Sequence, residues 1–188
     1  MGFTGNPWIK TPNMDKLANE NVRFSDFHVG TTCAPRRAGL MTGRHNNRVG
    51  VWHTIMWRSL LRKDEVMLAD VLRNNGYVTG MFGKWHLGDN YPYRPHDIGF
   101  DEAFYHGAGG VFQIADYWDN NYFDDIYFRN GVPEKTSGYC TDVWFSNAID
   151  WLTADQKKRM LQDLEQEHIL LLNEPKDFEL VPYDQVEQ

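Results

Sequence analysis

Apolar residues recur with helical spacing in three stretches of the chain. Within residues 64–75 they fall at i, i+1, i+4 and i+5, and Gly76 follows where a helix C-cap belongs. A Thr-Pro pair opens residues 12–20, and proline at the first helical position predicts a helix start. Residues 142–152 are amphipathic, with Thr141 as a plausible N-cap. We therefore expect a helix over each of these stretches.

Strand-like patterns lie between the expected helices. Residues 22–29 alternate apolar and polar side chains, and residues 77–82 form the short apolar run of a buried strand. The order strand, helix, strand favours the α/β class with a parallel sheet. Residues 88–138 are rich in aromatic residues, glycine and proline, which predicts long ordered loops and one short hairpin. Loops of this length are often functional.

The last part of the chain differs in charge from the rest. Residues 153–188 hold four Lys or Arg against nine Asp or Glu, whereas the whole chain has a net charge of −7. Thr153 and Gln156 fit a capping box, so we expect a helix from there to about residue 172, followed by an irregular acidic tail. This shift predicts two parts: residues 1–152, and residues 153–188 as an atypical acidic helical tail.

Composition excludes several classes of protein. The acidic net charge leaves no broad basic surface for nucleic acid. No apolar run approaches the roughly 18 residues of a membrane span. The first ten residues, MGFTGNPWIK, lack the apolar region of a signal peptide, and the compartment stays open. Cys33 and Cys140 are too few for a disulfide framework, although one bridge between them is conceivable.

Cys33 lies in an unusual chemical setting. It precedes Pro35 and the run RRAGLMTGR, which predicts a short helix that ends at Gly43. The partial positive charge of a helix N-terminus and the side chains of Arg36 and Arg37 favour a thiolate, and they also suit sulfate or phosphate. The alternative is a half-buried structural cysteine near two surface arginines.

A second cluster follows the apolar run 77–82. In an open α/β sheet, ligands bind beyond the carboxyl ends of the strands. Lys84 and His86 lie at i and i+2, so on an extended segment their side chains point the same way. Together they could neutralise an anion and donate a proton to a leaving group. The alternative is an ordinary strand exit with Trp85 packed inward.

The two clusters together resemble a known family. The residues CAPRR at 33–37, followed by LMTGR at 40–44, are similar to the C-x-P-S-R…L-x-T-G signature of the type I sulfatases, the arylsulfatases. GKWHLG at 83–88 is similar to their second signature. GNPWIKTPNMDKLANENVRF, GFDEAFYH and GYCTDVWFSNAIDWL also read like arylsulfatase sequence, so the resemblance covers roughly residues 2–152.

The resemblance implies an alkaline-phosphatase-like α/β fold, with a mostly parallel sheet flanked by helices. It implies that a formylglycine-generating enzyme oxidises Cys33 to formylglycine, whose hydrate attacks the sulfur of a sulfate ester. By position, Arg37 would hold the diol, Lys84 would contact the sulfate, and His86 would contact the diol or the leaving group. Ca²⁺ would be bound partly by the formylglycine at position 33 and would polarise the sulfate. The substrate would be a small sulfate ester or a sulfated carbohydrate, and such enzymes are often periplasmic or secreted.

The sequence departs from this family in three respects. Arg36 stands where the family usually has Ser or another small residue. The family's paired aspartates from a first strand lie upstream of the equivalent of residue 1, and its later Asp–Asn pair, second lysine and second histidine are not found here. Asp124 and Asp125 are better interpreted as a solvated turn. We therefore expect an N-terminal fragment of the fold that lacks its first strand and its C-terminal part.

Three functions remain open. The first is a formylglycine-dependent sulfuric ester hydrolase, and the second is a catalytically inactive sulfatase-like remnant or binding domain that lacks most metal ligands. The third, hydrolysis of phosphate esters, is weaker because such relatives usually carry Ser or Thr in place of Cys33. His53 and His106 could line a substrate pocket, although packing roles are favoured. The tryptophans are favoured as core or loop anchors, although an enzyme acting on carbohydrate would use some of them as sugar platforms.

Overall fold

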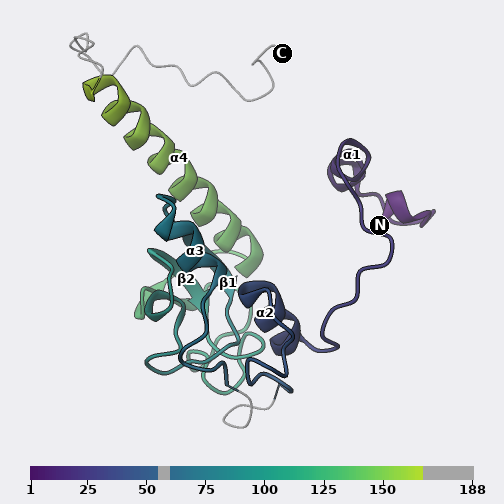
Figure 1. Cartoon of the computed structure of the whole chain (residues 1–188), viewed down its shortest axis with the longest axis horizontal. Coiled ribbons are helices and arrows are strands. Elements are labelled where there is room, and N and C mark those ends of the chain that lie inside the picture. The colour runs from purple at the N-terminus through teal and green to yellow at the C-terminus, as the bar shows by residue number, and fades with distance from the viewer. Residues whose placement is uncertain (55–59, 167–188) are drawn as a thin grey trace.

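The computed structural model describes residues 1–54 and 60–166, a mixed sheet with helices on it and a separate N-terminal segment (Figure 1). No helix in these two ranges is long and apolar enough to cross a membrane. The elements in chain order are η1 (Gly2–Thr4), α1 (Pro12–Glu20), α2 (Cys33–Thr42), α3 (Leu68–Asn74), β1 (Gly80–Lys84), η2 (Pro95–Asp97), β2 (Glu102–His106), β3 (Ile126–Arg129), β4 (Val132–Lys135) and α4 (Cys140–Gln166).

The sheet has the order β1-β2-β3-β4. Strands β1 and β2 are parallel, with Lys84 opposite His106, and the other two pairs are antiparallel. The predicted α/β class is confirmed, but the sheet of the described part is mixed. The predicted hairpin is β3–β4, and it turns at Asn130 and Gly131, whose positive φ angles of 48° and 85° give the reversal that a two-residue hairpin needs.

Helix α4 packs on the sheet through two tryptophans. A Cβ added at Gly80 would lie 2.9 Å from the Trp151 ring, and one at Gly83 would lie 3.5 Å from Trp144. The two glycines of β1 therefore let α4 approach the strand. Phe104, Tyr127 and Cys140 form the buried cluster between α4 and the sheet, while the larger buried cluster lies around Trp85 and α2.

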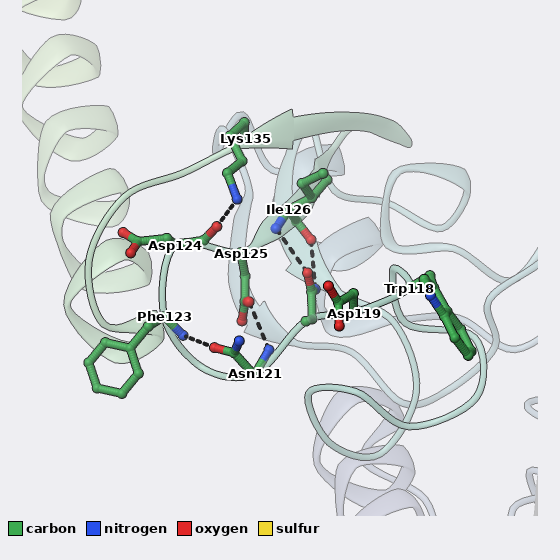
Figure 2. Close-up of a pocket in the computed structure, with 9 residues that line it drawn as sticks. Trp118, Asp119, Asn121, Phe123, Asp124, Asp125, Ile126 and Lys135 are labelled. Atoms are coloured by element: carbon green, nitrogen blue, oxygen red, sulfur yellow. Dashed lines mark hydrogen bonds between the residues drawn. The ribbon is translucent and has the colours of Figure 1, made fainter.

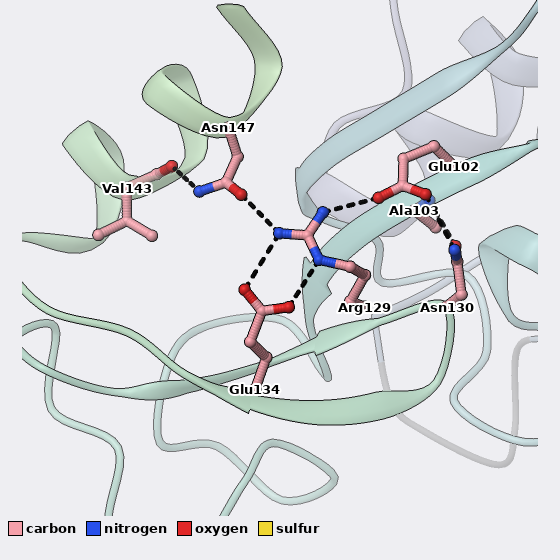
Figure 3. A network of polar contacts seen from close by, with 7 residues as sticks. All are labelled: Glu102, Ala103, Arg129, Asn130, Glu134, Val143 and Asn147. Atoms are coloured by element: carbon pink, nitrogen blue, oxygen red, sulfur yellow. Dashed lines mark hydrogen bonds and ion pairs between the residues drawn. The ribbon is translucent and has the colours of Figure 1, made fainter. Parts of the chain in front are cut away.

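Arg129 joins three elements to its own strand (Figure 3). From β3, its guanidinium donates to Glu102 on β2 at 2.7 Å and to Glu134 on β4 at 2.6 and 3.1 Å. It also donates to Asn147 on α4 at 2.6 Å and lies over the Phe104 ring, 4.5 Å from its centroid. These contacts fix α4 on the sheet and align β2, β3 and β4.

The N-terminal segment lies apart from the sheet, joined to α2 by a long coil (Figure 1). The predicted helix over 12–20 is confirmed, whereas the predicted strand over 22–29 is wrong. Phe24 and Phe27 in that stretch are exposed and contact one another. Alternation alone does not make a strand, since a strand needs a neighbour with which to form hydrogen bonds, and no described segment pairs with these residues.

Other boundaries differ from expectation for local reasons. Helix α3 begins at Leu68 rather than at residue 64, because the Asp70 carboxylate accepts the Met67 N–H at 3.0 Å and caps it there. The strand expected over 77–82 begins only at Gly80, and β2 was missed. The two helices expected on either side of residue 152 form one helix, in which Thr141 lies within the first turn. The division at 152 is thus inside α4, and residues 167–188 of the tail lie outside the described residues.

Candidate functional site

Cys33 is the first residue of α2, so the helix begins three residues before Arg36, where the pattern predicts its start. Its side chain is exposed, and it forms no disulfide. Gly30 packs directly against this first turn: a Cβ added there would lie 3.0 Å from the backbone N of Arg36 and from Pro35. Residue 33 is therefore presented to solvent at the positive end of a helix whose start is closely supported.

The two arginines after Cys33 differ in environment. Arg36 is exposed, whereas Arg37 is half-buried and lies one turn along from Cys33 on the same side of the helix. Its Nε donates to the backbone carbonyl of Trp85 at 2.5 Å. Burial lowers the pKa of Arg37, and negative charge at Cys33 opposes this shift, which places the thiol within electrostatic reach of the guanidinium. Of the two arginines, Arg37 is therefore the one that contacts the segment carrying Lys84 and His86.

Lys84 ends β1, and its Nζ donates to the Gly109 carbonyl at 2.5 Å. His86 lies beyond the strand with φ 59°, so the extended backbone that was expected through residue 86 is wrong. The two side chains are nevertheless neighbours. Burial and then the charges of Lys84 and Arg37 together lower the pKa of His86 to about 4, although a backbone hydrogen bond with Thr54 opposes them. His86 is therefore neutral at pH 7, and its buried Nδ1 has no partner among the described residues.

The structure adds His106 to this group. It ends β2 beside Lys84, stacks on Trp144 with ring centroids 5.2 Å apart, and has Nδ1 2.7 Å from the Gly107 carbonyl. Burial is the main cause that lowers its pKa to about 4; the charges of Lys84 and Arg37 act in the same direction, and a hydrogen bond with the Gly107 backbone opposes them. The stacking on Trp144 agrees with the packing role favoured for His106. Its position next to Lys84 also puts it beside the site. His53 is half-buried next to Thr54.

The loop after β2 forms the remaining wall. Ala108 has φ 59°, and its N–H donates to Asp89 Oδ1 at 3.0 Å. A Cβ added at Gly109 would lie 2.7 Å from His86 Cε1, so only glycine lets the loop approach the imidazole this closely. The glycine-rich run GAGG at 107–110 is the sequence signal for this wall. The sequence does not indicate that Gly109 packs against His86. Burial also raises the pKa of Asp89.

The site therefore combines an exposed residue 33, two cations and two neutral imidazoles. Arg37 and Lys84 can hold a tetrahedral oxyanion, and Lys84 has N–H groups left after its bond to the loop. A neutral histidine can accept or donate a proton at neutral pH. This arrangement suits transfer of an anionic group to or from a side chain at position 33.

The same region does not provide a metal site. Within residues 1–54 and 60–166, no group of three or more His, Cys, Asp or Glu could hold a metal ion. Asp124 is exposed, and its carboxylate accepts Ser137 Oγ and the Gly138 N–H, which fits the predicted turn. Asp125 is buried rather than solvated, and its carboxylate accepts two backbone N–H groups and a tyrosine hydroxyl. The described residues do not fit a calcium centre, which needs six to eight oxygen ligands.

Comparison with known proteins gives consistent matches. A family model described as Sulfatase matches residues 1–164. Arylsulfatase G of Canis lupus familiaris is 49% identical over 109 residues, which cover 55% of this chain and 20% of that protein. N-acetylglucosamine-6-O-sulfatase of Bacteroides thetaiotaomicron is 31% identical over 162 residues, which cover 85% of this chain and 26% of that protein. The chain thus spans between a fifth and about a quarter of the length of these relatives.

Solved structures agree with this result. The crystal structure of Ps i-CgsB in complex with k-i-k-neocarrahexaose matches with a TM-score of 0.72 and 29% identity, covering 82% of this chain and 38% of that one. A structure in complex with its substrate D-glucosamine-2-N,6-O-disulfate matches with a TM-score of 0.66 and 29% identity, covering 81% and 28%. The prediction of a partial alkaline-phosphatase-like fold is confirmed.

Proposed function

Because this chain belongs to the sulfatase family, we propose that its Cys33 site receives the sulfuryl group of a sulfate ester. The observation that carries this is the bond from Arg37 Nε to the Trp85 carbonyl, 48 residues away. It joins the two signature segments, which supports the proposal that the exposed residue 33, Lys84 and His86 act on one ligand. The family generally uses formylglycine and Ca²⁺, and the exposed position of Cys33 suits its modification by a formylglycine-generating enzyme.

The side chains have separate roles in this proposal. The hydrated aldehyde of a formylglycine at position 33 would supply a hydroxyl nucleophile. Arg37, fixed by its backbone bond, would orient the oxygens at position 33. Lys84 would bind a sulfate oxygen, which offsets charge that develops during transfer. His86 is neutral, so it can accept the proton of the hydroxyl at residue 33 and then pass this proton to the oxygen of the leaving group.

The substrate class follows from the relatives only in outline. The matched proteins include arylsulfatases and carbohydrate sulfatases, and we propose an aryl or carbohydrate sulfate ester for this chain. The second candidate is an inactive sulfatase-like domain that binds such esters without hydrolysing them. The lack of a metal-binding group among the described residues favours it for the chain in isolation.

Two measurements on the whole chain test the proposal. After co-expression with a formylglycine-generating enzyme, mass spectrometry of the Cys33 peptide should show the aldehyde. Hydrolysis of an aryl sulfate during a Ca²⁺ titration, lost in Cys33→Ala, would support the hydrolase. Ester binding without turnover at any Ca²⁺ concentration would support the binding domain. Unmodified Cys33 together with no ester binding would refute both.

A further inference from the structure

A second hollow lies outside the Cys33 site. It has a volume of about 410 Å³ and is formed by residues 118–121 and 123–126 together with Lys135 of β4 (Figure 2). The loop that supplies Gly109 to the Cys33 site continues directly into Trp118, at one end of this hollow. Its lining combines aromatic, amide, carboxylate and ammonium groups.

The floor of the hollow is held in a fixed shape. Asn120 is 5% exposed, and its side chain both donates to the Ile126 carbonyl at 2.8 Å and accepts the Ile126 N–H at 3.0 Å. The Asp125 carboxylate accepts the N–H groups of Asn121 and Tyr122, each at 2.8 Å. Lys135 Nζ donates to the Asp124 carbonyl. These bonds prearrange the hollow, which lowers the cost of ordering it around a ligand.

The groups left without partners surround this floor. Trp118 is 91% exposed and, within the described residues, its indole makes no hydrogen bond and no ring contact. The Asp119 carboxylate forms no hydrogen bond or ion pair in that same part of the chain, and the Asn121 amide uses only its oxygen, which accepts the Phe123 N–H. The Trp118 indole and the Asp119 carboxylate make no contact with other described residues that stabilises this turn, so both groups are available to a ligand.

This set of groups matches the chemistry of a neutral sugar. The apolar C–H face of a pyranose stacks on an indole, and its neighbouring hydroxyls donate to a carboxylate and accept from an amide. Three carboxylates against one ammonium repel an anion, so a sulfated sugar fits less well. A metal ion is disfavoured because no group in residues 1–54 and 60–166 could hold one.

We propose that this hollow binds an unsulfated sugar residue through Trp118 and Asp119. As a substrate site the proposal rests on the proposed function: the hollow would take the neutral residue of a saccharide that carries its sulfate elsewhere. Sugar binding itself does not depend on that function, so the two can fail separately. Sulfate binding at Arg37 reports on the Cys33 site, and glycoside binding at Trp118 reports on the hollow.

The test is an NMR titration of the full chain with methyl β-D-galactopyranoside and methyl β-D-glucopyranoside, observing the tryptophan indole N–H signals and the backbone amide signals of residues 119–126, which remain observable in Trp118→Ala. At least one glycoside should shift the Trp118 signal saturably in the millimolar range. Trp118→Ala should abolish binding, Asp119→Asn should weaken it several-fold, and galactose 6-sulfate should bind several-fold more weakly than the galactoside. Trp8→Ala is the matched control, because Trp8 is 87% exposed but lies on the N-terminal segment.

Each outcome decides the proposal. Absence of a saturable shift with either glycoside would overturn it, and so would binding that survives both Trp118→Ala and Asp119→Asn. Equal or tighter binding of the sulfated sugar would overturn the assignment to a neutral residue. Amide spectra of both variants that match those of the unmodified chain show that any loss of binding is local rather than a failure to fold.

Discussion

Acid should unfold this protein through the two buried histidines of the site. His86 and His106 are 9% and 2% exposed, and burial is the first cause of their low pKa values, about 4 for each ring. In the unfolded chain, histidine side chains have a pKa of about 6.5. Above pH 6.5 both states are neutral and no penalty arises. Between pH 6.5 and pH 4 the two histidines bind protons in the unfolded state but not in the folded state, so the free energy of unfolding falls as the pH falls.

The size of the effect follows from these values. At pH 5 each ring lowers the free energy of unfolding by about 2 kcal/mol relative to pH 7. The two contributions add to about 4 kcal/mol, because both rings stay mostly neutral in the folded protein at this pH. Asp89 and Asp116 act in the opposite direction: burial raises their pKa values, so their protonation on acidification favours the folded state.

A variant separates these contributions. His106→Phe keeps a ring to stack on Trp144 and loses the contact with the Gly107 carbonyl, which should cost about 1 kcal/mol at pH 7. Urea unfolding followed by tryptophan fluorescence should show that the loss between pH 7 and pH 5 is smaller in this variant by about 2 kcal/mol. His28→Gln is the control, because His28 is exposed on the N-terminal segment. An equal pH-dependent loss in His106→Phe and the unmodified chain would refute the reasoning.

Three further predictions follow from single contacts. Gly109→Ala places a Cβ 2.7 Å from the His86 ring; it should displace the imidazole, shift its NMR signals and weaken sulfate binding, and unchanged His86 signals would contradict this. Arg129→Met removes the hydrogen bonds of Arg129 to β2, β4 and α4. It should lower the free energy of unfolding by about 2 kcal/mol in urea titrations. A change below about 0.3 kcal/mol would contradict the role of Arg129 in holding these elements together. Arg37→Lys should weaken sulfate binding about tenfold, whereas Arg36→Lys at an exposed position should leave it nearly unchanged; equal effects would show that the motif points to the wrong arginine.

The sequence allows prediction of the site where its residues are close together in the chain. Cys33 and Arg37 lie one turn apart on α2, a helix whose end is marked by Gly43, so their relation follows from local geometry. Lys84 and His86 were recognised from their motif, although the backbone between them is not extended. In these cases a short segment carries most of the structural information.

The remaining features depend on contacts between distant segments. His106 joins the site because β2 pairs in parallel with β1, and no local pattern indicates that register. Gly109 is needed only because His86 lies against it. The stretch 22–29 has the alternation of a strand but lacks a neighbour in the described structure. The hollow beside Trp118 could not be predicted from the sequence either. Only the fold shows that Trp118 is exposed rather than packed in the core.

The most direct test of the account is a titration of the whole chain with inorganic sulfate, followed by NMR of the Arg37 side-chain N–H. The account predicts a saturable shift at Arg37, with affinity about tenfold lower in Lys84→Met, since a charge-assisted hydrogen bond is lost. A linear shift without saturation, or equal affinity in the two proteins, would contradict the claim that Arg37 and Lys84 hold the sulfuryl group beside residue 33.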